Sequence, residues 1–432
     1  MNHLLPQRIL VAPSGFKESL DSAAVAQAIA AGVRRALPGA VVKAVPIADG
    51  GEGTAQTLAE ATGGRLVPLR VTGPVGDPVD SHFALLGGEA RGTAVVEMAA
   101  AAGLRLVPCD RRDPGRTTSR GVGELIAAAI DAGARRILVG CGDSGTSDGG
   151  MGALQGLGAR VLDADGEPVP PGGDHLGRVA RLDLTGLHPA LAERSVDITL
   201  ALNPHNVLTG ARGVARVFGP QKGATPEQVE EMSAGFERWA AVLERDGLTR
   251  SGLDRGGFPG DVPGLAGLAG DGPGGGAVDL ATGPGTGASG GLGAGLAAVG
   301  ATLMPRFEAI LDSGLAGFDL DALLHGADLV ITAEGAIDFQ TPRGKVPAEV
   351  ARRAARQGVP VVALAGTLGR GARDVHDIGI DAIASIVPIP MTLQEAVDDG
   401  ERLLIEAAER LMRTIIFGAS MAATRLSPRP AW

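Results

Sequence analysis

The 432-residue sequence contains no Tyr and only two Trp, and aromatic residues make up just 3% of it. Its formal net charge is −10, so it offers neither a basic surface for a phosphodiester backbone nor many rings on which bases could stack. Nucleic-acid binding is therefore disfavoured. With 44% hydrophobic residues, the chain is still long enough to form two or three packed domains.

Cysteines are also few, and long apolar segments are absent. Neither Cys109 nor Cys141 has CxxC spacing or a nearby His, so we expect free buried thiols rather than a zinc site or a disulfide. Pro6 and Arg8 interrupt what would have to be an apolar signal core, and no later stretch reaches about 18 uncharged apolar residues. We therefore expect a cytoplasmic protein with no membrane contact.

Lysine is scarce as well, because the 39 basic residues include only four lysines, which are Lys17, Lys43, Lys222 and Lys345. In so arginine-rich a chain, each lysine is a candidate for a position where a planar guanidinium cannot replace a compact ammonium group. Three of the four lie in turns that contain Gly or Pro. These turns are therefore candidates for functional loops.

Both ends of the chain alternate short apolar runs with amphipathic stretches. In the N-terminal part we expect strands at 8–12 and 41–47 and helices at 21–37 and 54–63. In the C-terminal part we expect helices at 290–299, 347–357 and 393–412 and strands at 328–332, 359–365 and 382–387. Such alternation predicts a parallel sheet covered by helices, with ligands at the carboxyl ends of its strands.

The middle of the chain has a different pattern. The apolar runs 66–72, 79–86 and 93–98 resemble antiparallel strands of a second domain. After them we expect helices at 121–132 and 149–157, strands at 136–140 and 197–202, and a helix that starts at Thr225. The Gly-rich stretch near 247–287 has no usable period and is expected to form a long, lid-like loop, and residues 424–432 a frayed tail.

The predicted fold class is α/β with two domains. A Rossmann/flavodoxin-like parallel-sheet domain is built from both chain ends, residues 1–64 and 288–432, and residues 65–287 form an inserted mixed α/β domain.

The loop after the first predicted strand contains Ser14, Gly15, Phe16 and Lys17. It precedes a helix, whose N-terminal N–H groups and the Lys17 ammonium together favour binding of an anion. A tight turn with a solvated lysine is the alternative.

The loop after the second predicted strand contains Asp49, Gly50, Gly51 and Glu52. Two carboxylates three residues apart, in a loop that glycine lets approach a ligand closely, suit either a magnesium site or a general base. Capping of the next helix by Asp49 or Thr54 is the alternative.

A third loop, residues 142–150, consists only of Gly, Ser, Thr and Asp and includes Ser144 and Asp148. Such a loop can present backbone N–H groups to phosphates and hydroxyls to a metal or a sugar.

A fourth loop carries Glu334 and Asp338 and continues to Lys345, just before a predicted helix. This order is typical of a metal site next to a phosphate site, and a surface loop held by salt bridges is the alternative. Residues 218–223, with Lys222, are a weaker fifth candidate.

Familiar nucleotide and hydrolase motifs are missing. Val346 follows Gly344 and Lys345, so no GxxxxGK[ST] motif occurs, and the GxGxxG match at 285–290 does not follow a predicted strand. The sequence also has no HExxH. The loops together favour a phosphorylated ligand with a divalent ion, and phosphoryl transfer is the reaction class that uses both.

Five segments, 12–19, 48–54, 144–150, 218–224 and 334–345, resemble the type I bacterial glycerate kinases (glycerate 2-kinase), and their order and spacing hold from about residue 8 to 412. The resemblance implies a two-domain α/β enzyme with its active site between the domains. It also implies transfer of the γ-phosphoryl of ATP, with Mg²⁺, to a hydroxyl of D-glycerate, giving 2-phosphoglycerate.

The resemblance further implies roles for individual residues. Asp49 or Asp148 is expected to act as the base and Lys17 as a further catalytic residue, while Glu334 and Asp338 are expected to bind the metal. The expected substrate and phosphate contacts are Ser14, Phe16, Gly50, Gly51, Glu52, Ser144, Lys222 and Lys345.

The sequence departs from the family pattern within the motifs. Ser14 and Gly15 stand where the pattern has Asp and Ser, Asn203 replaces an Asp, and Ala336 replaces an Arg. Three positions of the third loop, Asp143, Gly145 and Ser147, also differ. These changes leave open a different small hydroxy acid as acceptor, or a non-catalytic homologue that binds nucleotide or acid. A homo-oligomer is also left open.

Overall fold

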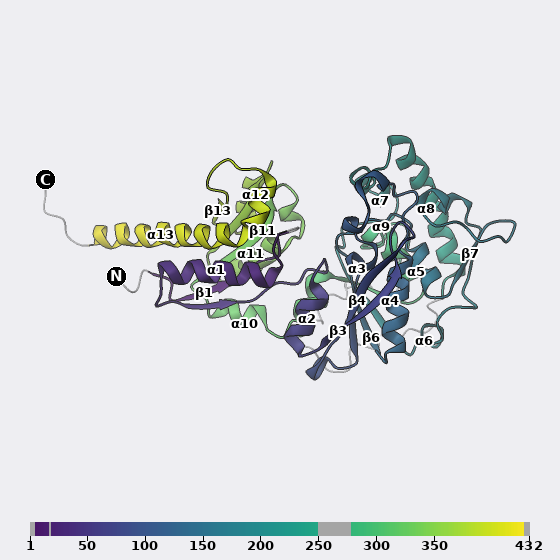
Figure 1. Cartoon of the computed structure of the whole chain (residues 1–432), viewed down its shortest axis with the longest axis horizontal. Helices are drawn as coiled ribbons and strands as arrows, with labels where there is room; N and C mark the ends of the chain where they lie inside the picture. The colour runs from purple at the N-terminus through teal and green to yellow at the C-terminus, as the bar shows by residue number, and fades with distance from the viewer. Residues whose placement is uncertain (1–4, 17–18, 249–277, 427–432) are drawn as a thin grey trace. The chain divides into compact units, whose positions relative to one another are not determined.

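Residues 5–16, 19–248 and 278–426 are described by the computed structural model, which divides the chain into two units (Figure 1). Unit 1 consists of Met1–Asp49 and Phe318–Trp432, and unit 2 of Gly50–Gly317. The borders therefore lie at other residues than the 64/65 and 287/288 expected from the sequence. Lys17, most of the Gly-rich loop and the end of the tail lie outside the described residues.

A five-stranded sheet forms the centre of unit 1, in the order β13-β12-β11-β1-β2. All its neighbouring strands are parallel, which confirms the predicted parallel sheet. The strands are β1 (Arg8–Val11), β2 (Val41–Ala44), β11 (Leu329–Ile337), β12 (Val361–Leu368) and β13 (Ala382–Ser385).

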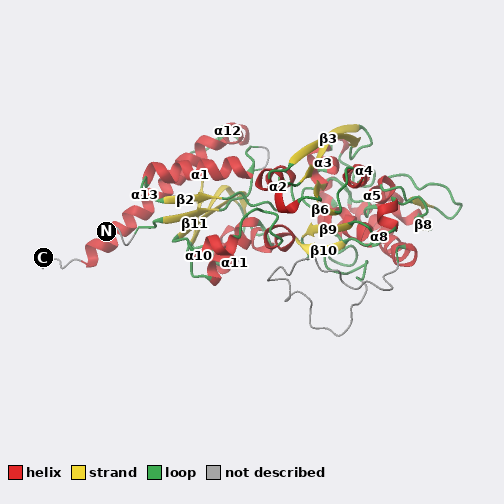
Figure 2. Ribbon diagram, turned by 90° about the horizontal axis from the view of Figure 1, so that it is seen from below, coloured by secondary structure: helices red, strands yellow, loops and turns green. Residues whose placement is uncertain are grey.

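Helices cover both faces of this sheet, as Figure 2 shows. One face carries α1 (Ser22–Ala36) and α13 (Gly400–Leu426), and the other carries α10 (Leu320–His325) and α11 (Val346–Arg356). A Cβ on Gly32 of α1 would lie 2.2 Å from the carbonyl oxygen of Ile405 in α13, so glycine permits their close crossing.

The predicted helix 393–412 is in fact two helices. A capping box of Thr392 and Glu395 starts α12 (Leu393–Asp398), which ends before α13 begins at Gly400.

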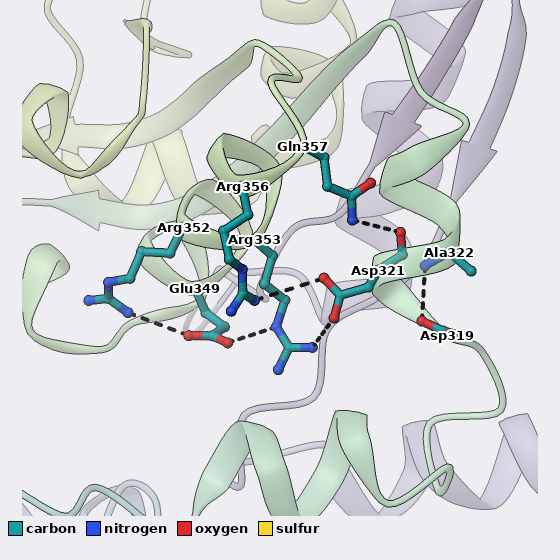
Figure 3. A network of polar contacts seen from close by, with 8 residues as sticks. All are labelled: Asp319, Asp321, Ala322, Glu349, Arg352, Arg353, Arg356 and Gln357. Atoms are coloured by element: carbon teal, nitrogen blue, oxygen red, sulfur yellow. Dashed lines mark hydrogen bonds and ion pairs between the residues drawn. The ribbon is translucent and has the colours of Figure 1, made fainter. Parts of the chain in front are cut away.

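A network of ion pairs joins α10 to α11 (Figure 3). Arg353 has a side chain only 6% exposed, and its guanidinium lies 2.8 Å from Glu349 and 3.0 Å from Asp321. Gln357 donates a hydrogen bond of 2.9 Å to the backbone oxygen of Asp321. This network therefore fixes the short helix α10 against α11.

Unit 2 contains a six-stranded mixed sheet in the order β10-β9-β6-β5-β4-β3. Its first three strands, β3, β4 and β5, are antiparallel neighbours, as the sequence predicts, whereas β5, β6, β9 and β10 run parallel. The strands are β3 (Arg65–Thr72), β4 (Pro78–Leu85), β5 (Thr93–Glu97), β6 (Arg136–Gly140), β9 (Asp197–Leu202) and β10 (Thr302–Pro305). A separate hairpin pairs β7 (Arg160–Leu162) with β8 (Arg181–Asp183).

The helices of unit 2 pack around a core that includes fully buried Trp239. A capping box at Thr225 confirms the predicted start of α8. The predicted helix 290–299 begins differently, because Ser289, Gly290 and Gly291 all have left-handed backbone conformations inside α9. The helices are α2 (Thr54–Thr62), α3 (Met98–Ala102), α4 (Arg120–Asp131), α5 (Met151–Gly156), α6 (Pro189–Ala192), α7 (Val214–Phe218), α8 (Pro226–Asp246) and α9 (Ala288–Ala297).

Two further expectations concern cysteines and membranes. Cys109 is exposed, contrary to the expected buried thiol, while Cys141 is partly buried. Among the described residues, no helix combines the length and the hydropathy that a membrane span requires.

Candidate active site

The order of strands in unit 1 reverses between β1 and β11. From β1 the chain continues to β2 on one side, and it later returns to β11 on the other side of β1. In open parallel sheets, ligands bind outside the carboxyl ends of the strands at such a switch point. Ser14 lies there, and both its backbone N–H and its hydroxyl donate to the carbonyl oxygen of Ala333, at 2.9 and 3.1 Å. The next residue of β11 is Glu334.

Three charged residues, Glu334, Asp338 and Lys345, form what we call the charge cluster. The Lys345 Nζ lies 3.1 Å from Glu334 Oε1 and 3.7 Å from Asp338 Oδ1. Lys345 is also the residue before α11, at the positive end of that helix. The structure thus brings together the predicted metal ligands and one predicted phosphate ligand.

Glu334 lies within β11 and not in a loop, contrary to the sequence prediction. β12 continues to pair with β11 beyond this position, up to Ile337 and Leu368, and so extends the strand. Regular backbone pairing with β12 therefore fixes the part of β11 that carries the Glu334 side chain, close to the carboxyl end of the strand.

The environment of Glu334 favours its neutral form. Burial raises the pKa of Glu334 to about 7, the Lys345 charge opposes this, and the carboxylates of Asp49 and Asp338 add to it. Within the described part of the chain, its buried Oε2 has no hydrogen-bond partner. An unsatisfied buried carboxylate oxygen is costly, so a bound cation would relieve it.

A magnesium ion fits this arrangement when a ligand supplies the remaining oxygens. Mg²⁺ usually binds through one or two carboxylates together with substrate phosphates and waters. The described residues contain no group of three or more His, Cys, Asp or Glu placed to hold a metal. Glu334 and Asp338 alone are therefore enough only for an ion shared with a phosphate chain.

Other predicted residues of the first loop are placed differently. Phe16 is 6% exposed and packs in the hydrophobic core of unit 1, so its ring has a packing role and a ligand contact stays a prediction. Lys17 lies outside the described residues.

The second loop crosses the border between the units, which falls after Asp49. Asp49 is partly buried, and its charge acts on Glu334 within unit 1. In unit 2, the Gly50 N–H donates to Thr54 Oγ1 at 3.1 Å. Glu52 is half exposed and forms an ion pair of 2.7 Å with Arg105.

Asp148, in the third loop, is fully buried in unit 2. It accepts hydrogen bonds from Ser119 N at 2.7 Å, from Ser119 Oγ at 2.9 Å, and from Gly150 N and Gly152 N at 3.1 Å each. Burial raises its pKa, and these four hydrogen bonds oppose that rise. The carboxylate therefore fixes the loop to the starts of α4 and α5.

Lys222 is also internal, with 2% of its surface exposed. Its Nζ donates to Ser144 Oγ at 3.0 Å and to the carbonyl oxygen of Thr146 at 2.5 Å. Burial lowers the pKa of Lys222 to about 7, and the charge of Asp148 opposes this. We call Ser144, Asp148 and Lys222 the buried loop cluster, because they hold the third loop from inside.

The sequence prediction missed Glu97. This residue ends β5, is 1% exposed, and its carboxylate accepts from Gly53 N at 3.3 Å and Ala55 N at 2.5 Å. It therefore caps α2 and supports the second loop from 44 residues away. The available signal was an acidic residue at the end of an otherwise apolar run.

Each unit thus presents a different chemical arrangement. The charge cluster joins an ammonium group, two carboxylates and an unpartnered oxygen at a ligand-binding edge, which suits an anionic ligand with a divalent ion. In the buried loop cluster, Asp148 and Lys222 are held by internal hydrogen bonds, which suits a rigid loop, although Thr146 Oγ1 and Ser147 Oγ of the same loop have no hydrogen-bond partner among the described residues.

Comparison with known proteins adds an independent result. A family model described as "Glycerate kinase family" matches residues 9–416. A glycerate kinase of Bacillus subtilis (strain 168) is 40% identical over 418 residues, which cover 96% of this chain and 99% of that protein. A glycerate 2-kinase of Escherichia coli (strain K12) is 38% identical over 412 residues, which cover 95% of this chain and 98% of that protein.

A solved structure is similar as well. The crystal structure of a protein from Salmonella typhimurium LT2, assigned as glycerate kinase 2, matches with a TM-score of 0.72 and 40% identity. The match covers 96% of this chain and 99% of that one.

Proposed function

The chain belongs to the glycerate kinase family, and on that premise we propose how its residues carry out the reaction. It is a kinase that phosphorylates glycerate with ATP. The finer proposal is transfer of the γ-phosphoryl to the 2-hydroxyl of D-glycerate, which gives 2-phosphoglycerate. The name of the Escherichia coli relative, glycerate 2-kinase, supports the 2-position.

The charge cluster carries the residue assignment. Lys345, 3.1 Å from Glu334 and 3.7 Å from Asp338, lies at the switch point of the parallel sheet. Phosphoryl transfer depends mainly on positioning and on neutralising phosphate charge. We therefore assign Lys345 to the phosphate chain of ATP and Glu334 and Asp338 to Mg²⁺, which when bound supplies further positive charge there.

Asp49 is the better candidate for the base. The Asp148 carboxylate already accepts four hydrogen bonds inside unit 2, so it has little capacity for a substrate proton. Asp49 is partly buried and acts electrostatically on Glu334. We assign it to accept the proton of the attacking hydroxyl, within the usual role of such a carboxylate.

The remaining predicted residues keep proposed roles of two kinds. Ser14, Lys17, Gly50, Gly51 and Glu52 are proposed substrate or phosphate contacts. Lys222, which is buried, and its hydrogen-bond partner Ser144, which is partly buried, are proposed to fix the shape of the third loop. The need for ATP supports a cytoplasmic enzyme.

An ADP-release assay with D-glycerate tests the function directly. We expect Mg²⁺-dependent turnover that EDTA abolishes, and a ³¹P NMR spectrum of a 2-phosphate ester. A 3-phosphate product would overturn the assigned position, and turnover only with a longer or branched hydroxy acid would overturn the acceptor.

The variants Asp49→Asn and Asp148→Asn test the base. We expect Asp49→Asn to lower kcat by about 100-fold or more while the protein remains folded. If Asp148→Asn stays folded and loses as much kcat while Asp49→Asn keeps it, the assignment is reversed.

A further inference from the structure

Unit 1 contains an open pocket of about 410 Å³ that is lined by Leu368 at the carboxyl end of β12 and by Ile383 of β13. Its volume is within the range of small-molecule sites, and neither the charge cluster nor any other assigned residue forms its wall. The other lining residues are Gly369, Gly371, Ala372, Arg373 and Asp374.

The pocket wall continues directly into the charge cluster. The Gly369 N–H donates to Ile337 O at 2.8 Å, and the Phe339 N–H donates to Arg370 O at 2.9 Å. A Cβ on Gly369 would lie 3.1 Å from the Cβ of Asp338. The backbone that forms the pocket therefore packs against the segment that carries Asp338.

Glycine is required at position 371 for this packing. Gly371 has φ +78°, and an added Cβ would approach the Cβ of Phe339 to 2.9 Å. A side chain there would push the pocket wall away from Phe339. The sequence thus keeps this wall close to the Asp338 segment.

The pocket and its rim expose apolar surface that unit 1 leaves uncovered. Leu368 is 41% exposed and Phe339, next to the pocket, is 46% exposed. Ala372 and Ile383 add apolar lining, and the exposed Arg373 and Asp374 add a guanidinium donor and a carboxylate acceptor. An apolar pocket with a few polar groups is typical of sites for flat, partly polar ligands.

Glycerate and ATP differ in how much apolar surface each could bury in this pocket. Glycerate is polar at every carbon, so an apolar wall would give it no binding energy. The adenosine part of ATP has a flat base with apolar faces and hydroxyl donors that a carboxylate can accept. Of the two, adenosine fits this surface.

We propose that this pocket binds the adenosine part of ATP, so that the phosphate chain runs past Asp338 towards Lys345. The proposal rests on the proposed function, because it takes ATP as the phosphoryl donor. It assigns Leu368, Ala372 and Ile383 to the base and Asp374 to the ribose hydroxyls.

The variant Leu368→Asp tests the pocket by placing a charge against the base. Phe417→Asp is the matched control, because Phe417 is 65% exposed on α13 of the same unit. Isothermal titration calorimetry measures binding of ADP and, separately, of inorganic tripolyphosphate, both with Mg²⁺. We expect Leu368→Asp to weaken ADP binding by about tenfold or more and tripolyphosphate binding by less than about twofold.

Other outcomes overturn the proposal. Unchanged ADP binding would show that adenosine binds elsewhere, and equal loss of ADP and tripolyphosphate binding would show that the change acts on the phosphate site or the fold. Weaker glycerate binding with normal ADP binding would make the pocket an acid site. Wild-type turnover with ATP and glycerate is measured in parallel, so failure of the proposed function is seen separately.

Discussion

Two clusters of similar residue composition, one in each unit, have different environments. In unit 1, the side chains of Glu334, Asp338 and Lys345 are between 19% and 26% exposed, and one carboxylate oxygen has no partner among the described residues. In unit 2, Asp148 and Lys222 are at most 2% exposed, and their polar atoms bind the loop itself. The same residue types therefore form a partly exposed cluster that could bind a ligand in unit 1, and a buried cluster that stabilises a loop in unit 2.

The difference shows that glycine, carboxylate and lysine after a strand do not by themselves define a ligand site. Burial decides which partner the charged groups have. A fully buried carboxylate must be satisfied by the protein, whereas a partly exposed one can exchange water for a ligand. Substitutions in the charge cluster should accordingly affect mainly activity, and substitutions in the buried loop cluster should affect mainly stability.

Removal of the Asp148 carboxylate should have the largest effect on stability. Asp148→Ala leaves Ser119, Gly150 and Gly152 without their acceptor and Lys222 without its opposite charge, so unit 2 should lose about 3–5 kcal/mol. Urea unfolding followed by Trp239 fluorescence, in a Trp432→Phe background, measures this. Glu334→Gln, the counterpart in unit 1, should change the unfolding free energy of unit 1, followed by circular dichroism, by less than about 1 kcal/mol.

Comparable losses from the two variants would remove the contrast between the clusters. A shift of less than about 1 kcal/mol for Asp148→Ala would likewise contradict the bracing role.

The ion-pair network of α10 and α11 should behave like the buried cluster although it belongs to unit 1 (Figure 3). Arg353→Met removes the buried cation that Glu349 and Asp321 share and should destabilise unit 1 by about 3 kcal/mol, measured by urea unfolding with circular dichroism. Arg356→Met is the control, since that side chain is 68% exposed and its ion pair is worth at most about 0.5 kcal/mol. Equal effects of the two variants would show that burial is not the deciding factor.

Lys345→Met should affect activity and spare stability. Loss of one cation at the phosphate chain should lower kcat/KM by about 100-fold or more, while the unfolding free energy changes by less than about 1 kcal/mol. Lys43→Met, at an exposed position of β2, controls for loss of a positive charge in unit 1. A large stability loss with kcat/KM retained would place Lys345 with the structural residues.

The smallest effects should come from pH, with opposite signs in the two clusters. The pKa of Glu334 is raised from 4.5 to about 7, so the native protein keeps a proton that the unfolded chain has lost. Wild-type stability relative to Glu334→Gln should therefore fall as pH rises from 4.5 to 7. The pKa of Lys222 is lowered from 10.5 to about 7, so here the unfolded chain keeps the extra proton. Wild-type stability relative to Lys222→Met should rise from pH 7 to 10.5.

Within its pH window, each of these changes should be about 1 kcal/mol per pH unit, measured by urea unfolding across the pH range. Slopes of the same sign in both variants would contradict the two assigned environments.

Much of unit 1 could be predicted because its strands are apolar runs bounded by Gly and Pro. The charge cluster could also be predicted, since its three residues lie within 12 positions of one another. β10 could not, because Thr302–Pro305 has neither the length nor the pattern of a strand and is formed by pairing with β9.

Burial was the information that the sequence did not contain. Residues 142–150 and Lys222 have the composition of a phosphate loop, and only tertiary packing shows that Asp148 and Lys222 point into unit 2. Glu97 was missed for a related reason, because its contact with the second loop depends on chain segments 44 residues apart.

The pairing of β1 with β11 also has a consequence for how the protein is made. Arg8 binds Asp328 across 320 positions, and the whole of Gly50–Gly317 lies between them. At ordinary ribosomal speeds, β1 leaves the exit tunnel roughly 15–60 s before its central neighbour is translated. The inserted unit is thus synthesised completely before β1 and β2 can pair with β11, so the proposed phosphate-binding edge forms late in the synthesis of the chain.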